Sequence, residues 1–280
     1  MNPAIPKMLK RPLDAHKMSV GVVVVIAGSY AYQGAGYLTT MAALRAGAGM
    51  VHFVFPAPLY SVYASKLNEP ILHPVAATDS GSLSSAAWQY IIKLLEKADS
   101  FAVGPGLSTH PDTQELVTQL YGEAPVPGVF DADALNCLAL REHDLALHAA
   151  SRILTPHPGE YGRIAKDSGD SEQNIIEFSS RTRTVVVFKN STPLVTDGFS
   201  SFTVTEGTPS LATAGTGDVL TGMVGAFLCK YASAFEAALA AAYAHGRAGR
   251  IAGEVLSIES VIASDLLGYI PLVIKDLIAE

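Results

Sequence analysis

The stretch Gly21-Val22-Val23-Val24-Val25-Ile26-Ala27 decides the fold class, because it is a continuous run of mostly β-branched residues. Such a run is typical of a strand that is buried on both faces of a parallel sheet. Residues 34–48 follow with helical spacing of apolar side chains, and residues 50–55 predict a second strand. A strand, a helix and a strand in this order predict a βαβ unit.

Strand-like and helix-like segments alternate almost to the end of the 280-residue chain. Further strands are predicted at residues 100–103, 126–130, 151–154 and 184–188. Further helices are predicted at residues 88–97, 113–121, 134–140, 159–164, 172–181, 218–231, 235–252 and 260–279. Residues 193–196 and 202–205 flank Asp197-Gly198 and predict a small antiparallel hairpin. We therefore expect one α/β domain over residues 1–280 with a mainly parallel sheet, preceded by a loose arm at residues 1–18.

The composition excludes some classes of partner. The net charge is −7 and no run of lysine or arginine occurs, so neither nucleic acid nor an anionic membrane is expected as the main partner. Cys137 and Cys229 lie in apolar stretches and are expected to be buried packing residues in a reducing compartment. No signal peptide or membrane span is recognised, which predicts a soluble, cytoplasmic protein.

Glycine and polar residues follow the predicted strands. In open α/β sheets, ligands bind beyond the carboxyl ends of the strands. Five such segments at one edge of one sheet predict a binding site there. These segments are Gly28-Ser29, Gly104-Pro105-Gly106, Asp131-Ala132-Asp133, Thr155-Pro156-His157-Pro158-Gly159-Glu160 and Lys189-Asn190-Ser191-Thr192.

A sixth segment, Ala212-Thr213-Ala214-Gly215-Thr216-Gly217-Asp218-Val219-Leu220, adds a glycine turn that opens a helix. Converging backbone N–H groups and the positive end of the helix dipole suit an anion such as phosphate. The same residues also fit an ordinary helix start, with Thr216 as the cap and Asp218 as a dipole partner. The segment by itself leaves both interpretations open.

Common nucleotide motifs do not match. The glycines at 28, 34 and 36 depart from G-x-G-x-x-G, and no P-loop pattern occurs. Ala35 and Gly36 nevertheless open a helix and leave room for a flat ring. No spacing typical of a zinc site or of a Ser-His-Asp triad is found.

Several polar residues permit two interpretations. His157 stands between two prolines that fix its direction, as a ligand contact or as a structural residue. Lys189 follows a buried strand and suits a nucleotide phosphate or a solvated position. Asp131 and Asp133 suit a metal ion or the cap of the helix near residue 134, and capping is favoured for Asp133.

Together these segments resemble the ADP/ATP-dependent NAD(P)H-hydrate dehydratases of the ribokinase-like superfamily. The order of the matching pieces is that of the family, over residues 16–250. The pieces are Gly28-Ser29 with Gly34-Ala35, Ala43-Leu-Arg-Ala-Gly-Ala-Gly49, Gly104-Pro-Gly-Leu107, Asp131-Ala-Asp-Ala-Leu-Asn136, Leu154-Thr-Pro-His-Pro-Gly-Glu160, Val187-Phe-Lys189 and Ala212-Thr-Ala-Gly-Thr-Gly-Asp218.

The resemblance implies a ribokinase-like three-layer sandwich and a cofactor-repair enzyme. Such an enzyme dehydrates (S)-NADHX or (S)-NADPHX to NADH or NADPH and converts ADP to AMP and phosphate. Family positions that contact the hydrated nicotinamide nucleotide correspond to Ala35, Gly106, His157 and Asp218. Family positions of the nucleotide site correspond to Lys189, Asn190, Ser191, Thr192, Pro193 and Gly217, and the adjoining Gly215 and Thr216 are included for their backbone amides.

The mechanism hypothesis makes Asp218 the general base on the substrate hydroxyl, which attacks the terminal phosphoryl of ADP or ATP. Amides of residues 214–217 form the anion hole, and Mg²⁺ is expected from phosphoryl transfer in general, with no metal ligands assigned. The resemblance also implies a homo-oligomer, often a tetramer, and a separate epimerase.

The sequence departs from the family at His16-Lys17-Met18-Ser19, at Tyr32-Gln33, at Ala214 and at Asn190. An alanine at 214 requires a φ below zero. Two other functions are weighed, a ribokinase-like kinase of a small alcohol such as hydroxymethylpyrimidine or hydroxyethylthiazole, and a nucleotide sensor without catalysis.

Overall fold

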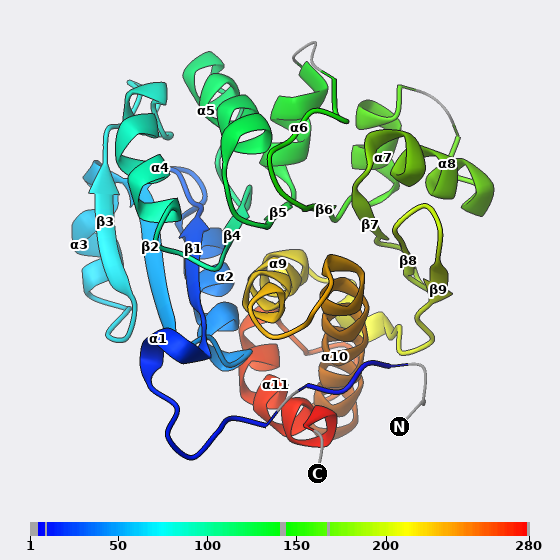
Figure 1. Ribbon diagram of the computed structural model, residues 1–280. Coiled ribbons are helices and arrows are strands. Elements are labelled where there is room, and N and C mark those ends of the chain that lie inside the picture. The colour runs from blue at the N-terminus through cyan, green and yellow to red at the C-terminus, as the bar shows by residue number, and fades with distance from the viewer. Residues whose placement is uncertain (1–4, 9, 141–143, 167–168, 279–280) are drawn as a thin grey trace.

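The computed structural model describes residues 5–8, 10–140, 144–166 and 169–278. Its centre is a nine-stranded sheet in the order β3-β2-β1-β4-β5-β6-β7-β8-β9 (Figure 1). In this order, all strands from β3 through β2, β1, β4, β5 and β6 to β7 pair in parallel. Strand β8 is antiparallel to both β7 and β9, and β8 and β9 form the predicted hairpin at one edge. The strands are β1 Val22–Ile26, β2 Met50–Pro56, β3 Ile71–Val75, β4 Ser100–Val103, β5 Gly128–Phe130, β6 Arg152–Leu154, β7 Val185–Phe188, β8 Leu194–Thr196 and β9 Ser201–Thr203.

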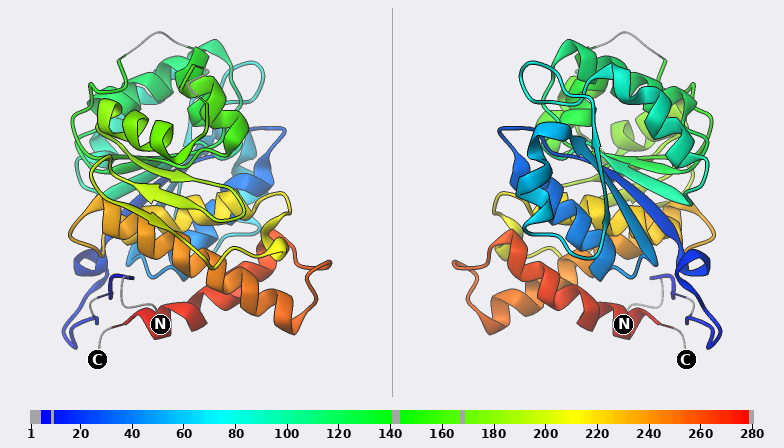
Figure 2. Two further views of the ribbon diagram at one scale, coloured as in Figure 1. Left: turned by 90° about the vertical axis from the view of Figure 1, so that its right-hand side faces the viewer. Right: turned by 90° about the vertical axis from the view of Figure 1, so that its left-hand side faces the viewer.

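Helices cover both faces of this sheet, which gives the predicted three layers (Figure 2). One face carries α4 Trp88–Leu95, α5 Pro111–Glu123, α6 Asp133–Leu140, α7 Pro158–Ile164 and α8 Glu172–Thr182. The other carries α2 Gln33–Arg45, α9 Thr216–Leu228 and α10 Ala234–Val255, with α11 Ala263–Leu277 packed on their outer side. The short helices α1 Lys17–Val20 and α3 Tyr60–Ala64 lie beside β1 and β2.

The valine run of β1 is buried on both faces, as its composition predicts. Val23 and Val25 belong to the apolar core under α2, α9 and α10. Val24 and Ile26 belong to the second core, under α4, α5 and α6. A strand with two apolar faces therefore joins two separate cores.

Helix α9 packs closely against its neighbours at two of its three glycines, Gly222 and Gly225. A Cβ on Gly222 would lie 2.1 Å from the carbonyl oxygen of Thr39 in α2, and a Cβ on Gly225 would lie 3.1 Å from the Cβ of Ala102 in β4. The close approach fixes where α9 begins, at the carboxyl ends of the strands.

A buried cation stabilises the opposite end of the sheet. Arg152 is fully buried and donates hydrogen bonds to the carbonyl oxygens of Leu120, Tyr121 and Ala124 at the end of α5, and to that of Val126. The guanidinium thereby satisfies carbonyls that a helix end leaves unpaired.

Some expectations differ from the structure. Strand β3 and helices α1 and α3 are not predicted; β3 is an edge strand that contains Pro74 and is poorly buried. The described part of the expected loose arm is anchored, since Ile5 and Met8 are buried and Met8 pairs with Ile278. Residues 1–4, 9 and 279 lie outside the described residues.

Cys137 is buried as predicted, whereas Cys229 is partly exposed. Within the described ranges, every helix is too short or too polar to cross a bilayer.

Candidate active site

Backbone hydrogen bonds bring the segments after the strands together at one edge of the sheet. The N–H of Gly28 donates to the carbonyl of Pro105 at 2.8 Å, and the N–H of Gly104 donates to that of Ile26 at 3.3 Å. Further along the same edge, the N–H of Lys189 donates to the carbonyl of Pro156 at 2.8 Å. The predicted clustering at the carboxyl ends is therefore confirmed.

The glycine turn before α9 leaves the start of the helix open. Gly215 is the N-cap residue, with φ of +92°, and it supplies no side-chain cap. The Thr216 hydroxyl donates to the carbonyls of Leu211 and Thr213, at 2.9 and 3.0 Å, instead of accepting from its own helix. Thr216 is thus not the cap, and the first N–H groups of α9 face an open site.

The two departures from glycine in the family pattern fit their backbone positions. Among the described residues with positive φ, neither Ala214 nor Asn190 occurs. The condition stated for an alanine at 214 is therefore met.

A buried ion pair lies beside this helix start. The Lys189 Nζ is 2.5 Å from Asp131 Oδ1 and 3.7 Å from Glu160 Oε2. Burial lowers the pKa of Lys189, but Asp131 and Glu160 outweigh that effect and raise it, so the ammonium is held charged. Thr221 Oγ1 donates to the other oxygen of Asp131 at 2.6 Å. Lys189 is therefore a fixed cation, and the solvated alternative is wrong.

Gly217 keeps the space between the helix start and the cation free of side chains. A Cβ at this position would lie 3.4 Å from Lys189 Nζ and 3.6 Å from Asp131 Oδ2. The helix dipole and the ammonium therefore face the same small space, which suits a phosphoryl group.

Asp218 lies in the first turn of α9, and its pKa is raised. Burial, and then the charge of Asp131, raise the pKa of Asp218 to about 7, although Lys189 opposes the shift. A carboxylate with a pKa near 7 suits a general base at neutral pH.

Asp133 does not act as predicted. Its carboxylate accepts a hydrogen bond from the N–H of Ser108 at 2.8 Å and from the Asn136 side chain at 3.2 Å. It therefore ties the loop after β4 to α6, and no hydrogen bond to a backbone N–H of its own helix is found.

His157 is the N-cap residue of α7. Its Nδ1 accepts from the N–H groups of Gly159 and Glu160, at 3.0 and 3.4 Å, while its ring remains half exposed. Glu160 completes a capping box by accepting from the N–H of His157 at 2.9 Å. The structural and the ligand-facing roles of His157 are compatible, because the cap uses Nδ1, and Nε2, which lies 3.4 Å from Glu160 Oε1, belongs to a ring that is half exposed.

Glu160 belongs to one of the predicted strand-end segments, but no role in the site was predicted for it. Its carboxylate is 5 % exposed and contacts both His157 and Lys189. Burial raises its pKa, against the opposing charge of Lys189. The spacing of a capping box, with an acid three residues after the cap, was the available signal.

Ala35 and Gly106 lie against each other at the start of α2. A Cβ on Gly106 would lie 2.9 Å from that of Ala35 and 2.6 Å from that of Tyr32, and the φ of Gly106 is +64°. Leu38 of the same helix approaches Gly215, since a Cβ there would lie 2.8 Å from the Leu38 Cδ1. The start of α2 thus borders the turn before α9.

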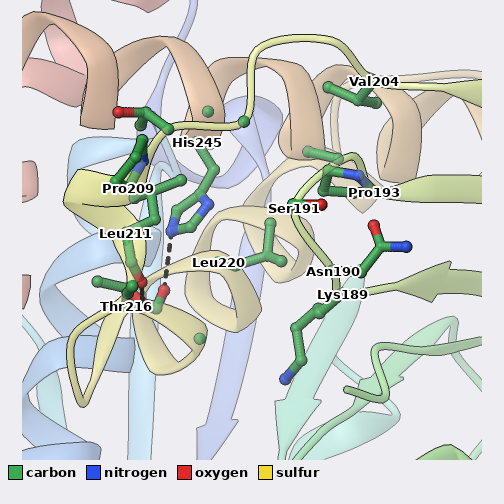
Figure 3. A pocket seen from close by; sticks show the side chains of 16 residues that line it. Lys189, Asn190, Ser191, Pro193, Val204, Pro209, Leu211, Thr216, Leu220 and His245 are labelled. Atoms are coloured by element: carbon green, nitrogen blue, oxygen red, sulfur yellow. Dashed lines mark hydrogen bonds between the residues drawn. The ribbon is translucent and has the colours of Figure 1, made fainter. Parts of the chain in front are cut away.

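A cavity of about 550 Å³ opens beside the ion pair (Figure 3). Six of the eight residues predicted for the nucleotide site line it, namely Lys189, Asn190, Ser191, Pro193, Thr216 and Gly217. Thr192 and Gly215 adjoin these residues in sequence without lining the cavity, and neither do Ala35, Gly106, His157 and Asp218. Lining residues that were not predicted include Pro209, Leu211, Leu220 and His245.

Comparison with known proteins identifies the family of the chain. The family model for NAD(P)H-hydrate dehydratase matches residues 23–272. The chain belongs to the NAD(P)H-hydrate dehydratase family. Members are hydro-lyases, and the family resemblance suggested by the motifs is confirmed.

Curated relatives of this dehydratase family are named bifunctional NAD(P)H-hydrate repair enzymes. The one from Moorella thermoacetica is 35 % identical over 97 % of this chain and 52 % of its own length. The one from Gloeobacter violaceus is 35 % identical over 96 % of this chain and 52 % of its own length. The chain thus spans about half the length of the curated relatives it matches.

Solved structures of similar proteins have the same fold. The ADP/ATP-dependent NAD(P)H-hydrate dehydratase from Bacillus subtilis, co-crystallised with ATP and Mg²⁺, superposes with a TM-score of 0.82 at 26 % identity, over 98 % of this chain and 99 % of that one. A ribokinase-like superfamily protein from Enterococcus faecalis has a TM-score of 0.86 at 21 % identity, over 97 % of this chain and 93 % of that one, which confirms the fold.

Proposed function

We propose that the chain catalyses the ADP-dependent dehydration of (S)-NADHX and (S)-NADPHX to NADH and NADPH, with release of AMP and phosphate. The observation that carries this proposal is Asp218, a carboxylate with a pKa near 7 in the first turn of an uncapped helix beside the partly buried Lys189. A base and an anion-binding site side by side are what phosphoryl transfer to a hydroxyl requires.

In the proposed reaction, Asp218 removes the proton from the ring hydroxyl of the substrate. The hydroxyl oxygen attacks the terminal phosphorus of ADP, the bond from that phosphorus to the bridging oxygen breaks, and AMP leaves. The electron pair of the ring nitrogen then expels phosphate, and the neighbouring ring carbon loses a proton to form the dihydropyridine. Amides of residues 214–217 and the Lys189 ammonium stabilise the charge on the transferred phosphoryl group.

The proposed substrate site consists of Ala35, Gly106, His157 and Asp218. The contact between Ala35 and Gly106 and the half-exposed ring of His157 support it. The proposed nucleotide site is the cavity with Lys189, Asn190, Ser191, Thr192, Pro193 and the turn at residues 215–217. The fixed cation at one end and the apolar wall at the other support that assignment.

We propose Mg²⁺ as the metal that accompanies the nucleotide. Two carboxylates beside the helix start, Asp131 and Glu160, supply the hard oxygen ligands that Mg²⁺ prefers. No group of three metal-ligating side chains occurs in the described part of the chain, which suits an ion held mainly by phosphates and water. When bound, the ion neutralises phosphate charge.

The assay is recovery of absorbance at 340 nm from hydrated NADH, run with ADP and with ATP in parallel. Recovery that requires a nucleotide supports the proposal and ranks the two phosphoryl donors. A small-alcohol kinase instead accumulates a phosphorylated product without this absorbance, and a nucleotide sensor releases no AMP or phosphate. A hydroxyethylthiazole kinase from Pyrococcus horikoshii shares the fold alone, with a TM-score of 0.61 at 17 % identity.

We further propose a homotetramer, a cytoplasmic location and a separate epimerase activity that supplies the S epimer. The bifunctional names of the curated relatives support the link to a second repair activity. Light scattering during size-exclusion chromatography tests the tetramer, and turnover of the R epimer only after adding an epimerase tests the last point.

A further inference from the structure

His245 is a buried polar residue in the wall of the nucleotide cavity that the proposed mechanism does not use. It belongs to α10 and is 8 % exposed. Its Nε2 lies 2.8 Å from the carbonyl oxygen of Thr216, the first residue of α9. Figure 3 shows the ring between Leu211 on one side and Leu220 on the other.

This contact fixes the tautomer of the imidazole. A carbonyl oxygen can only accept a hydrogen bond, so Nε2 carries the proton. Burial lowers the pKa of His245 to about 4, which keeps the ring neutral near pH 7. Nδ1 is therefore unprotonated, and it can only accept a hydrogen bond.

Among the described residues, the side chain of His245 bonds Thr216 through Nε2, and Nδ1 makes no hydrogen bond. Much of the cavity wall near it is carbon, from Pro209, Leu211 and Leu220. The charged groups lie elsewhere in the cavity lining, at Lys189 and the start of α9. An apolar wall with one acceptor suits the flat base and ribose of a nucleotide whose phosphates face Lys189.

We propose that Nδ1 of His245 accepts a hydrogen bond from the nucleoside part of the bound nucleotide and makes the cavity selective for it. The donor is the amino group of adenine or a ribose hydroxyl. A 6-oxo base places an acceptor where the amino group was, so it would face the lone pair of Nδ1 and bind more weakly. This inference rests on the proposed nucleotide site.

Two substitutions separate the acceptor from the contact with Thr216. In His245→Gln, the amide nitrogen replaces Nε2 and still donates to Thr216, but no acceptor remains at the position of Nδ1. In His245→Asn, the amide oxygen replaces Nδ1 as acceptor, and the contact with Thr216 is lost. His148→Gln is the matched control, since His148 bonds the carbonyls of Ala150 and Thr182 instead.

The experiment is calorimetric titration of each protein with ADP, IDP, 2′-deoxy-ADP and 3′-deoxy-ADP, without the hydrated substrate. We expect the wild type and His148→Gln to prefer ADP over one of the analogues by on the order of tenfold. His245→Gln loses this preference and His245→Asn keeps most of it. Loss of the preference over IDP identifies the base amino group, and loss of the preference over a deoxy analogue identifies that hydroxyl.

Two results would overturn the inference. If ADP binds and His245→Gln keeps every preference of the wild type, Nδ1 selects nothing and the proposed function is untouched. If no nucleotide binds the wild type, the proposed function fails together with the inference. The imidazole ¹⁵N signals give a readout that a structural role would leave unchanged, since ADP must shift the Nδ1 signal of His245 in the wild type.

Discussion

Replacing Asp218 by asparagine is expected to abolish turnover and to make the folded protein more stable. Asparagine has the shape of a protonated aspartic acid, but it cannot remove a proton from the substrate hydroxyl. The folded state holds the charged form of Asp218 at a cost, because burial and Asp131 raise its pKa from 3.8 to about 7. The same surroundings that make the group a base therefore weaken the fold.

The size of this cost follows from the pKa. A rise from 3.8 to about 7 corresponds to an upper limit of ~4 kcal/mol for the charged form. Asp218 is partly exposed, and solvent screening reduces the expected gain in the variant to about 2 kcal/mol.

The sign depends on pH. Below about pH 4 the carboxyl is protonated in both the folded and the unfolded state, so Asp218→Asn has no effect on stability. As the pH rises from 4 to above 7, the unfolded state loses the proton first and the wild type loses stability relative to the variant. Above pH 7 the difference is constant.

The measurement is urea unfolding of both proteins at pH 4.5, 6 and 8, with the 340 nm assay at pH 8. Asp112→Asn is the matched control, since Asp112 also lies in the first turn of a helix, α5, and accepts from Ser84 Oγ at 2.9 Å. It is expected to keep turnover and to lose stability. Turnover in Asp218→Asn, or equal stability of that variant and the wild type at pH 8, would refute the reasoning.

Three further substitutions test other parts of the site and the fold. Gly217→Ala places a methyl group 3.4 Å from Lys189 Nζ and is expected to raise the Kd for ADP by about tenfold. Because alanine forms helices better than glycine, the melting temperature is expected to stay unchanged or to rise. Unchanged affinity would exclude an anion at this turn. Lys189→Met leaves Asp131 and Glu160 buried without a cation and is expected to cost about 3–5 kcal/mol in urea unfolding; a cost below 1 kcal/mol would mean that water replaces the ammonium. Arg152→Met leaves buried carbonyls unpaired and is expected to cost about 3 kcal/mol of stability with kcat unchanged, and a fall in kcat at full folding would contradict its purely structural role.

The fold was largely predictable because its signals are local. The valine run of β1 and the glycine or polar residues after most of the buried strands are visible in a short window. Strand β3 was not, because its side chains are half exposed and Pro74 interrupts the pattern. Edge strands bury too little surface to impose an apolar sequence.

The positions of site residues that directly follow strands could be predicted from the sequence. The charge and the contacts of these residues could not, because they depend on partners far away in the chain. Lys189 could be placed at a strand end, but its charge is fixed by Asp131, 58 residues earlier. His245 gave no signal, since an apolar helix supplies it to a contact with Thr216, 29 residues away. The raised pKa of Asp218 likewise depends on burial, which no sequence spacing encodes.

The glycines that seat α9 have a consequence for the chemistry at its start. A helix of this length is a stiff rod, so a sideways push at Gly222 is transmitted along it rather than absorbed. A methyl group there would meet the backbone of α2 at Thr39, which cannot yield, and the whole of α9 would have to shift. Asp218 would then move relative to Lys189, which directly follows strand β7 of the sheet. The alignment of proton acceptor and cation thus depends on a contact one helical turn away that touches no ligand.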